Sequence, residues 1–367
     1  MDSTTTKANG SSWLASLKSV GGVVAGAVII AIIYGYITNP SVTTAVLASS
    51  LRQSTPLVLG ALCGLIGERS GIVNIGIEGM MLMAAFTGFM ANVALSAEGV
   101  NPALQTVPVR MGLSILVALL TGGALGLLHG LLSIQYRVDQ IVSGTVINIL
   151  ALGLTGYFYE LDTPTLGKLP ALIANPWTQD GSVKLQIADN FKFYLPYDIG
   201  RILFDKDIIT YATPVLVFVV GWALFHTTWG LRTRSIGENP RAADTLGINV
   251  YRMQYTNLFW SGVMAGLAGA FLTLAAVGIF EQNMTAGRGF IALAVMIFGN
   301  WRPWGALKGA LLFGFATALQ GQLQQFGIDF PHQLVGMLPY LLTIIVLAGF
   351  VGRARPPAHD GIPYVQE

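Results

Sequence analysis

Long apolar runs alternate with short polar interruptions along the chain, and this pattern predicts a polytopic helical membrane protein. Seven windows of 20 or more residues contain no Asp, Glu, Lys or Arg. These windows are residues 19–51, 111–136, 140–159, 208–231, 253–280, 309–328 and 330–352. A helix that crosses a bilayer needs about 20 apolar residues. Several of the windows must therefore be membrane spans.

The first window is long enough for more than one element. It accommodates a helix at about residues 20–38, a turn at Asn39-Pro40, and the start of a second helix that runs toward Leu65. A third helix is expected at about residues 77–95, and residues 289–299 with their flanks predict a short or tilted one. The fold class expected is an all-α polytopic membrane protein with about ten transmembrane helices, some of them broken.

Composition and charge support a membrane protein and set its orientation. Hydrophobic residues make up 53% of the chain and charged residues only 10%, against about 25% charged in soluble proteins. A cytoplasmic N-terminus places most Lys and Arg of the short loops inside, as the positive-inside rule requires. The expected organisation is a cytoplasmic segment 1–18, a transmembrane domain 19–352 and a cytoplasmic tail 353–367. Within the domain, loop 160–207 is external and loop 228–252 is cytoplasmic.

Several classes of chemistry lack a signal in this sequence. The single cysteine, Cys63, lies in an apolar segment and is expected to be a small buried hydrophobe. The four histidines are scattered, and no HExxH, CxxC or phosphate-binding GxxxxGK[ST] motif occurs. We therefore expect no catalytic site, no metal and no cofactor in this chain. If ATP drives the protein, another subunit binds it.

The stretch GERSGIVNIGIEGMMLM, residues 67–83, is the most polar interruption of the apolar pattern. An ionisable side chain in a bilayer costs about 2.5–3.5 kcal/mol, so Glu68, Arg69 and Glu78 need partners, water or an interfacial position. The pair Glu68-Arg69 is expected to neutralise itself or to anchor the cytoplasmic end. Four clustered glycines predict a broken helix, which is tolerated at membrane depth only when buried in protein or facing a watery cavity.

The stretch GENPRAADTLGINVYR, residues 237–252, predicts a short helix between two spans. Asn239 is a suitable N-cap, Pro240 fits the first helical position, and Gly247 fits the left-handed stop. A helix of about two turns is not stable alone. It is either an ordinary loop helix that rests on its own bundle or a knob that docks a partner.

Small residues at helical spacing indicate close helix packing. Gly122, Gly126 and Gly130 form one such row, and Gly262, Gly266 and Gly269 form another. The two halves of the chain each contain a Gly-rich break, at 64–89 and 286–314, and would run in opposite senses across the membrane. The short tail after Arg355 is expected to be disordered or a minor contact, and no function is assigned to it.

Three segments together resemble the membrane permease of a bacterial ABC importer. They are LRQSTPLVLGALCGLIGERSGIVNIGIEGMMLMAAF (51–86), GENPRAADTLGINVYR followed by SGVMAGLAGA (261–270), and GRGFIALAVMIFGNWRPWGALKGALLFG (287–314). The chain is similar to the branched-chain amino acid and ribose permease superfamily, and most similar to its nucleoside-importing branch. The resemblance implies a type II ABC importer-like fold in the bacterial inner membrane. It also implies two permease subunits, often different homologous chains, with two cytoplasmic ATPases and an external substrate-binding protein.

The resemblance implies roles for residues already singled out. The cytoplasmic loop would be the coupling helix that sits in a groove of the ATPase. Its residues are Gly237, Glu238, Asn239, Pro240, Arg241, Ala242, Ala243, Asp244, Leu246 and Gly247. The residues assigned to the substrate path are Asn74, Glu78, Asn148 and Arg52. For Arg52, a salt bridge or a snorkelling position competes evenly with a role in the path.

An apolar path with a few carboxamides suits an uncharged solute that has hydrogen-bonding edges, such as a nucleoside. Two alternatives remain open. The same machine could carry a branched-chain amino acid or a sugar, although a zwitterion would require more fixed charge or helix termini along the path. An ion-coupled carrier with Glu78 as its protonated group would need no ATPase.

Overall fold

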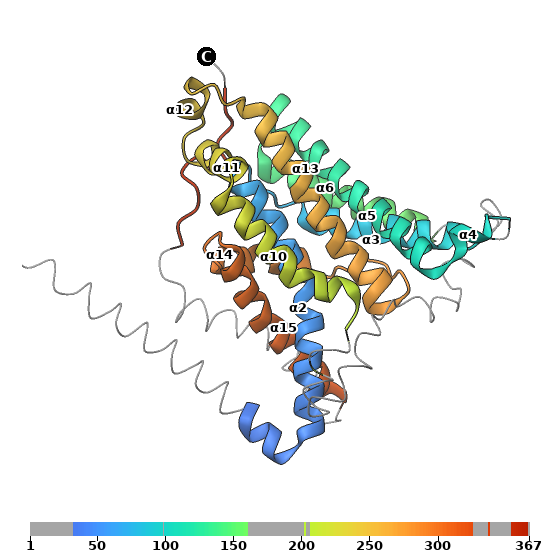
Figure 1. Cartoon of the computed structure of the whole chain (residues 1–367). Helices are drawn as coiled ribbons and strands as arrows, with labels where there is room; N and C mark the ends of the chain where they lie inside the picture. Colours follow the sequence, from blue (N-terminus) through green and yellow to red (C-terminus); the bar gives the residue numbers. More distant parts are fainter. Residues whose placement is uncertain are drawn as a thin grey trace, which may run out of the picture. The chain divides into compact units, whose positions relative to one another are not determined.

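The computed structural model describes residues 32–97, 99–160, 206–325 and 354–365, together with the single residues 202 and 337 (Figure 1). All regular elements within these ranges are helices. The chain divides into two compact units. The larger holds residues 54–185, 206–310 and 355–367, and the smaller holds 1–53, 186–205 and 311–354.

Four helices form the centre of the larger unit. They are α3 (Ile77–Leu95), α5 (Val107–Gly130), α6 (Gln140–Glu160) and α13 (Val250–Ala270). Figure 1 shows them side by side, and α3 packs against each of the other three. The α3 sequence is apolar on all sides, which is typical of a helix buried in the middle of a bundle.

Helices α5 and α13 cross as antiparallel neighbours at small residues. Gly122 faces Gly262 and Gly126 faces Leu258, so residue numbers fall along α13 as they rise along α5. A Cβ added at Gly122 would lie 2.7 Å from the backbone nitrogen of Gly266. The absence of side chains is what allows the two backbones to approach. The predicted packing role of these glycine rows is confirmed.

Two π-helical turns extend these helices. Leu131–Gln135 (η1) continues α5, and Phe271–Val277 (η3) continues α13. With these extensions the two helices reach 29 and 28 residues, longer than a perpendicular span requires.

Helix α2 (Pro40–Glu68) begins in the smaller unit and ends in the larger. In the larger unit, its Gly60 faces Ala292 and its Gly64 faces Met296 on α14 (Arg288–Phe298). Residue numbers rise together along both helices, so the second half of α2 and α14 run parallel.

The elements of loop 228–252 follow α10 (Ile208–His226). They are α11 (Thr228–Glu238) and α12 (Pro240–Thr245), and α13 begins directly after them. Thr227 caps α11 by accepting the Gly230 N–H at 3.2 Å. Gly230 packs against the carbonyl groups of Ala223 and Leu224, so α11 begins in close contact with the last turn of α10.

The described part of the smaller unit contains a helix at residues 32–38, the first part of α2 and the later part of α15 (Pro303–Gln325). The helix ends and α2 begins on either side of Asn39, as the Asn39-Pro40 turn predicted. The N–H of Asn39 donates to the Gly35 carbonyl at 2.8 Å, and its own carbonyl accepts from the Thr43 N–H at 3.1 Å.

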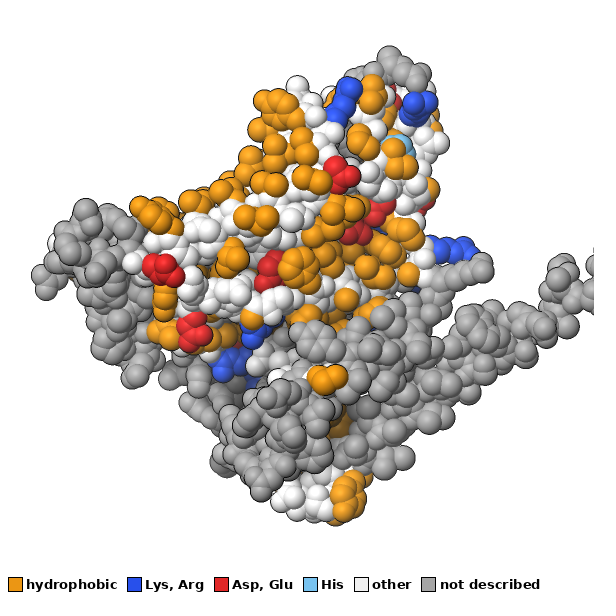
Figure 2. Space-filling view, turned by 180° about the vertical axis from the view of Figure 1, so that it is seen from behind, with side chains coloured by type: hydrophobic (Ala, Val, Ile, Leu, Met, Phe, Trp, Pro, Cys, Tyr) orange, Lys and Arg blue, Asp and Glu red, His pale blue; other side chains and the backbone are white. Residues whose placement is uncertain are grey.

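Five helices among the described residues are long and apolar enough to cross a membrane. They are Ile77–Leu95, Val107–Gln135, Gln140–Glu160, Ile208–His226 and Val250–Val277. Apolar side chains are also spread over the outer face seen in Figure 2, as a lipid-facing surface requires. The all-α class is confirmed, and the third helix has the predicted bounds. The expectations for residues 20–31, loop 161–205 and span 330–352 lie outside the described residues, and so does part of the ten-helix count.

Candidate functional site

The polar stretch between α2 and α3 is a break in the helices. Residues 69–71 form a turn, in which Gly71 adopts a left-handed φ of +84°, and residues 72–74 form no regular structure. The Val73 N–H donates to Gln140 Oε1 at 2.7 Å, and His129 Nε2 lies 2.9 Å from the Val73 carbonyl. A carbonyl only accepts, so His129 Nε2 carries the proton. Side chains of α5 and α6 thus supply hydrogen bonds that the non-helical backbone of the break lacks, as a break at membrane depth requires.

Asn74 lies at the centre of the break and is completely buried. Its amide oxygen accepts the Gly76 N–H at 3.0 Å. Its amide nitrogen lies 3.3 Å from Ser261 Oγ on α13 and 3.6 Å from the sulfur atoms of Cys63 and Met80. The carboxamide therefore joins the break to α2, α3 and α13.

Asn148 on α6 holds the N-terminus of α3. Its amide oxygen accepts the Gly79 N–H at 2.7 Å, and its amide nitrogen donates to the Ile75 carbonyl at 3.0 Å. A Cβ at Gly79 would lie 2.7 Å from the Asn148 Cα, so only glycine allows this approach. One carboxamide thus supplies both the acceptor and the donor that the interrupted backbone lacks.

Glu78 on α3 holds the N-terminus of α14 in the same way, but with a carboxylate. Its Oε1 accepts the Gly287 N–H at 2.8 Å and its Oε2 accepts the Gly289 N–H at 2.6 Å. The side chain is buried, with 8% of its surface exposed. The positive end of the α14 dipole and two N–H donors favour a negative charge at this position.

The length of α14 indicates how deep Glu78 lies. An 11-residue helix is about 16 Å long, roughly half of a 30 Å hydrocarbon core. The C-terminal end of α14 leads into residues 299–302, which meet the predicted cytoplasmic end of α2. Its N-terminus and Glu78 therefore lie about half a membrane thickness from residues 299–302.

Glu68 and Arg69 contact the same residue at the cytoplasmic end of the break. The Trp301 indole N–H donates to Glu68 Oε2 at 2.6 Å. Arg69 donates from Nε and Nη2 to the Trp301 carbonyl at 3.1 and 2.8 Å. Its guanidinium also lies 5.8 Å from the centre of the Phe225 ring. Of the two predicted roles for the pair, these contacts correspond to the anchor.

Trp301 is held in an uncommon conformation by these contacts. Asn300 and Trp301 have φ values of +53° and +51°, a region that bulky residues rarely adopt. Its indole and its carbonyl are both bonded to the 68–69 pair, which fixes the turn between α14 and α15. The bonds offset the strain of the turn.

The short helix of the cytoplasmic loop forms as predicted. The Asn239 side chain accepts the Ala242 N–H at 3.1 Å, Pro240 is the first helical residue, and Gly247 has a left-handed φ of +79°. Ala242 is exposed, and 82% of the Leu246 side chain is exposed, a large fraction for leucine. The opposite side of α12 is buried through Pro240 and Ala243.

The end of α11 connects this loop to the break. Gly237 packs directly on the backbone of Arg69 and lies close to Gly71, because it has no side chain. Gln254 on α13 lies 3.4 Å from the Ser70 carbonyl. The start of the break therefore touches the elements on both sides of α12.

The C-terminal residues 354–365 are packed against this region, so the expectation of a disordered tail is wrong. Tyr364 is 6% exposed and lies in a cluster with Ile236, Ala243 and Val250. Burial also raises the pKa of the Asp360 carboxyl to about 7. The tail is fixed because its aromatic side chain fills a gap beneath α12.

The structure brings together three of the four residues assigned to the substrate path. Asn74, Glu78 and Asn148 surround the break and the start of α3. Arg52 belongs to the smaller unit, and its side chain is exposed. Each of the first three has its polar atoms engaged by backbone or neighbouring side chains.

Sequence reasoning missed His129, Gln140, Ser261 and Trp301 as parts of this site. The signal for His129 was available, since it is a polar side chain within a charge-free window and is completely buried. Its Nδ1 lies 3.0 Å from Ser143 Oγ, so both ring nitrogens are bonded. Trp301 gave no comparable signal, because an indole is common near a membrane interface.

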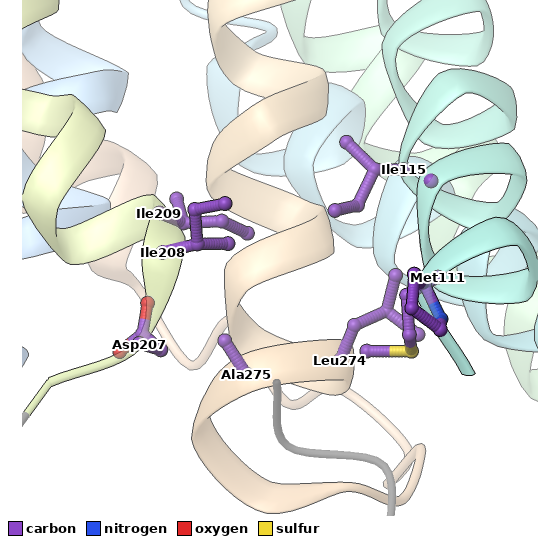
Figure 3. Close-up of a pocket in the computed structure, with 9 residues that line it drawn as sticks. Met111, Ile115, Asp207, Ile208, Ile209, Leu274 and Ala275 are labelled. Atoms are coloured by element: carbon purple, nitrogen blue, oxygen red, sulfur yellow. The ribbon is translucent and has the colours of Figure 1, made fainter. Parts of the chain in front are cut away.

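A separate cavity of about 180 Å³ lies between α5, α10 and η3 (Figure 3). Met111, Ile115, Ile209 and Leu274 contribute to its apolar wall. The carboxylate at its edge, Asp207, accepts the Thr210 N–H at 2.8 Å and caps α10. The cavity is smaller than the roughly 300–1,000 Å³ of typical ligand sites. It contains none of the residues assigned to the path.

Comparisons with known proteins address the class of the chain. Residues 46–347 match the family described as branched-chain amino acid transport system / permease component. The chain is 37% identical over 341 residues to the guanosine ABC transporter permease protein NupQ of Bacillus subtilis (strain 168), covering 88% of this chain and 96% of that protein. It is 38% identical over 330 residues to the nucleoside ABC transporter permease protein NupC of Lactococcus lactis subsp. cremoris (strain MG1363), again covering 88% and 96%. It is 25% identical over 314 residues to the guanosine ABC transporter permease protein NupP of Bacillus subtilis (strain 168), covering 83% and 81%.

The chain belongs to this family of transport permease components. It is a multi-pass membrane protein and a transporter subunit, since its relatives are named as permease proteins. The resemblance to ABC permeases is confirmed, and so is the prediction that the chain is not an enzyme.

Proposed function

We propose that this chain is the permease subunit of an ABC importer for nucleosides and forms half of the translocation path. A separate cytoplasmic ATPase hydrolyses ATP, a second homologous permease chain forms the other half of the path, and an external binding protein delivers the solute. The chain holds no cofactor of its own. It lies in the bacterial inner membrane with both termini in the cytoplasm.

The observation that carries this proposal is the shape of the 237–247 loop. A helix with a fixed start and a fixed end presents Ala242 and the exposed Leu246 outward. Small residues permit close approach of a partner, and an exposed leucine gives it an apolar contact. These features favour a helix that docks into a groove of the ATPase.

A contiguous set of contacts leads from this loop into the membrane. Gly237 at the end of α11 lies on the backbone of Arg69 and Gly71, where the break begins. The break leads to α3, and Glu78 on α3 holds the start of α14. Movement of the docked loop would therefore shift the break and the two helix ends at the middle of the membrane. Alternating access driven by ATP requires that motion of the ATPase reach the helices that line the translocation path.

We assign Asn74, Glu78, Asn148 and Arg52 to the path. The first three fix two helix N-termini near the membrane centre, a place that offers N–H donors to the ribose and base edges of a nucleoside. Their carboxamide and carboxylate groups would exchange backbone partners for solute as the break rearranges. Arg52 would contribute a donor from α2.

The relatives support a pair of different permease chains. Two permease proteins of Bacillus subtilis, NupQ and NupP, are both named for a guanosine ABC transporter, and this chain is 37% identical to one and 25% to the other. The nucleoside substrate is supported by the names of NupQ and NupC. This chain would then take the role of NupQ beside a NupP-like partner.

The orientation is supported by which loops meet. Arg69, the end of α11, residues 299–302 and the C-terminal tail lie together, and all were assigned to the cytoplasm by charge. Gln282 lies 3.4 Å from Glu160, the first residue of the predicted external loop.

Uptake of radiolabelled nucleosides tests the proposal, in cells that lack this chain and in cells with it restored. Ribose and leucine are the comparison solutes. We expect nucleoside uptake alone to be lost and rescued. Loss of ribose or leucine uptake instead would overturn the substrate and keep the permease, while no change for any solute would reopen the ion-coupled carrier.

A second experiment tests the docking loop. Leu246→Ala should reduce ATPase recovered with the permease and nucleoside uptake together, because an exposed apolar contact is removed. The matched control is Leu231→Ala, at a leucine of α11 that is 58% exposed. Equal effects of the two substitutions would contradict a specific docking role for α12.

A further inference from the structure

The C-terminal residues 355–364 run across four segments that are far apart in the sequence. These segments are the turn after α14, the end of α11, the start of the helix break, and α12. Five hydrogen bonds fasten the tail to them. The bonds join Arg355 N to Asn300 Oδ1 (3.1 Å), Ala358 N to Glu238 Oε2 (3.3 Å), His359 N to the Gly237 carbonyl (2.9 Å), Gly361 N to the Gly71 carbonyl (3.3 Å), and Tyr364 Oη to Asp244 Oδ2 (2.8 Å).

Tyr364 is the apolar anchor of this tail. Its ring is buried among Ile236 of α11, Ala243 of α12 and Val250 of α13, and its hydroxyl donates to Asp244 on the side of α12. The ring of Tyr251 lies 5.4 Å away, centre to centre. The short α12 helix buries little surface of its own, so Tyr364 provides much of the apolar surface against which α12 packs.

The tail also contacts the start of the break directly. The carbonyl oxygen of His359 lies 3.4 Å from the position that a Cβ of Gly71 would occupy. Val73 Cγ2 lies 3.5 Å from the position that a Cβ of Gly361 would occupy. Gly237 contacts the same turn, and its Cα lies 3.6 Å from the Cβ position of Gly71. The tail and the end of α11 therefore meet at the start of the break.

We infer that residues 355–364 form a strap that makes the coupling helix α12 and the helix break move as one body, with Tyr364 as its positioning residue. This inference rests on the proposed function, because it takes α12 to be the helix that receives motion from the ATPase. Without the strap, α12 is linked to the break only through its neighbours in the chain, the end of α11 and the start of α13. Motion of the ATPase would then change the backbone angles at Asn239 and Gly247, on either side of α12, and would not reach the helices in the membrane.

The measurement that tests the strap is the number of solute molecules imported per ATP hydrolysed. It is made on the complex purified through this chain with its native partners and reconstituted with the binding protein in liposomes. Tyr364→Phe removes only the hydroxyl and should lower this ratio by about threefold or more while the ATPase rate is kept. Tyr136→Phe is the matched control, since that tyrosine is 68% exposed and lies outside the strap.

Substitutions at the acceptor separate positioning from general stability. Asp244→Ala removes the acceptor and, because Asp244 also lies on the coupling helix, should lower the ratio at least as far as Tyr364→Phe does. Adding Tyr364→Phe to Asp244→Ala should change nothing further, because the bond is already absent. Additive losses in the double variant would contradict the inference.

A distance measurement tests the strap without transport. Spin labels on Arg252→Cys and Ile362→Cys lie on two exposed positions, at the start of α13 and on the tail, and the native Cys63 is buried. We expect one narrow distance distribution in the nucleotide-free and the ATP-bound complex. Addition of Tyr364→Phe should raise the detached fraction about tenfold, the effect of one hydrogen bond to a charged group. A broad distribution in the parent complex would overturn the strap.

The outcomes distinguish the strap from the proposed function. If the parent complex imports no nucleoside, the proposed substrate fails, and the distance measurement still decides whether the strap exists. If the parent complex imports nucleosides and Tyr364→Phe leaves the import-to-ATP ratio unchanged, the strap fails and the permease function stands.

Discussion

The two ends of the break between α2 and α3 use polar groups in different ways. At the deep end, residues 74–79, the side chains of Asn74, Glu78 and Asn148 are bonded mainly to backbone groups of helix ends. At the end predicted to be cytoplasmic, residues 67–71, Glu68 and Arg69 are bonded to Trp301, and the backbone contacts the tail and α11. The deep end completes interrupted helices, and the cytoplasmic end joins separate segments.

Solvent explains this difference. In the hydrocarbon core, no water is available to hydrogen-bond an unpaired N–H or C=O group. Each polar side chain therefore forms hydrogen bonds with the nearest unpaired backbone groups. Near the predicted cytoplasmic side water is available, and charged side chains can link separate segments. Loss of a polar group should therefore cost most at the deep end, and least in the tail.

The largest effect is expected from Glu78→Ala. The part-buried N–H of Gly287 and the buried N–H of Gly289 would lose their acceptor, at about 1–3 kcal/mol each. We expect the free energy of unfolding to fall by about 2–6 kcal/mol, measured in detergent or lipid nanodiscs, and nucleoside uptake to be lost. Glu78→Gln keeps one good acceptor and should lose about half as much.

The control for Glu78 is the exposed acid Glu281, in the same segment between η3 and α14. Glu281→Ala should change stability by less than about 0.5 kcal/mol. A similar loss in both variants would show that charge in this segment, rather than the helix cap, is what matters.

A smaller effect is expected from Asn148→Ala at the start of α3. The Gly79 N–H and the Ile75 carbonyl would each lose one neutral partner, and we expect a loss of about 1–3 kcal/mol in the free energy of unfolding. Thr145→Ala, at an exposed position on the same helix, is the control. If Asn148→Ala cost as much as Glu78→Ala, the carboxylate would have no advantage over a carboxamide at a helix end.

At the cytoplasmic end, Arg69→Lys should have a mild effect on stability and a clearer one on transport. Lysine can still donate once to the Trp301 carbonyl but cannot reproduce the two bonds from one planar group. We expect a stability loss of about 1 kcal/mol and a severalfold slower nucleoside uptake. Arg302→Lys, an exposed neighbour of Trp301, should change neither quantity.

The smallest effect is expected from pH. Because burial raises the pKa of Asp360 to about 7 from an ordinary 3.8, the folded tail binds a proton more tightly than the unfolded tail. Stability from this group is complete below about pH 4, declines as pH rises toward 7, and is level above that. The thermal midpoint of the wild type should therefore fall, relative to that of Asp360→Asn, between pH 5 and pH 7. Using this difference removes the contribution of the neighbouring His359, whose pKa burial lowers, and reports on Asp360 together with the Glu68 carboxyl with which it interacts. A constant difference across this range would contradict the raised pKa of Asp360.

Much of the local structure could be predicted because its causes are local. The absence of charge over 20 residues is enough to place α5, α6, α10 and α13 in the membrane. Asn239, Pro240 and Gly247 act within one or two turns, so the bounds of α12 followed directly. The glycine rows at 122–130 and 262–269 likewise predicted packing from spacing alone.

The polar groups of the site could be located from the sequence, but their partners could not. Glu78 and Gly287 are separated by 209 positions, and Glu68 and Trp301 by 233. Nothing in either local pattern says which of many buried N–H groups a carboxylate will meet. The same holds for the tail. Its polar, proline-rich sequence is typical of a disordered segment, and only the structure shows that Tyr364 packs between α11, α12 and α13.

The sequence by itself therefore determined which segments enter the membrane, where the helices are interrupted and where a short cytoplasmic helix is exposed. These features depend on transfer of apolar surface out of water and on backbone sterics over a few residues. Only the tertiary structure decided that Asn148 caps α3, that Glu78 caps α14 and that the tail fastens α12 to the break. Those pairings depend on which distant backbone groups are left without water when the helices pack, and that is settled only once all of the helices are in place.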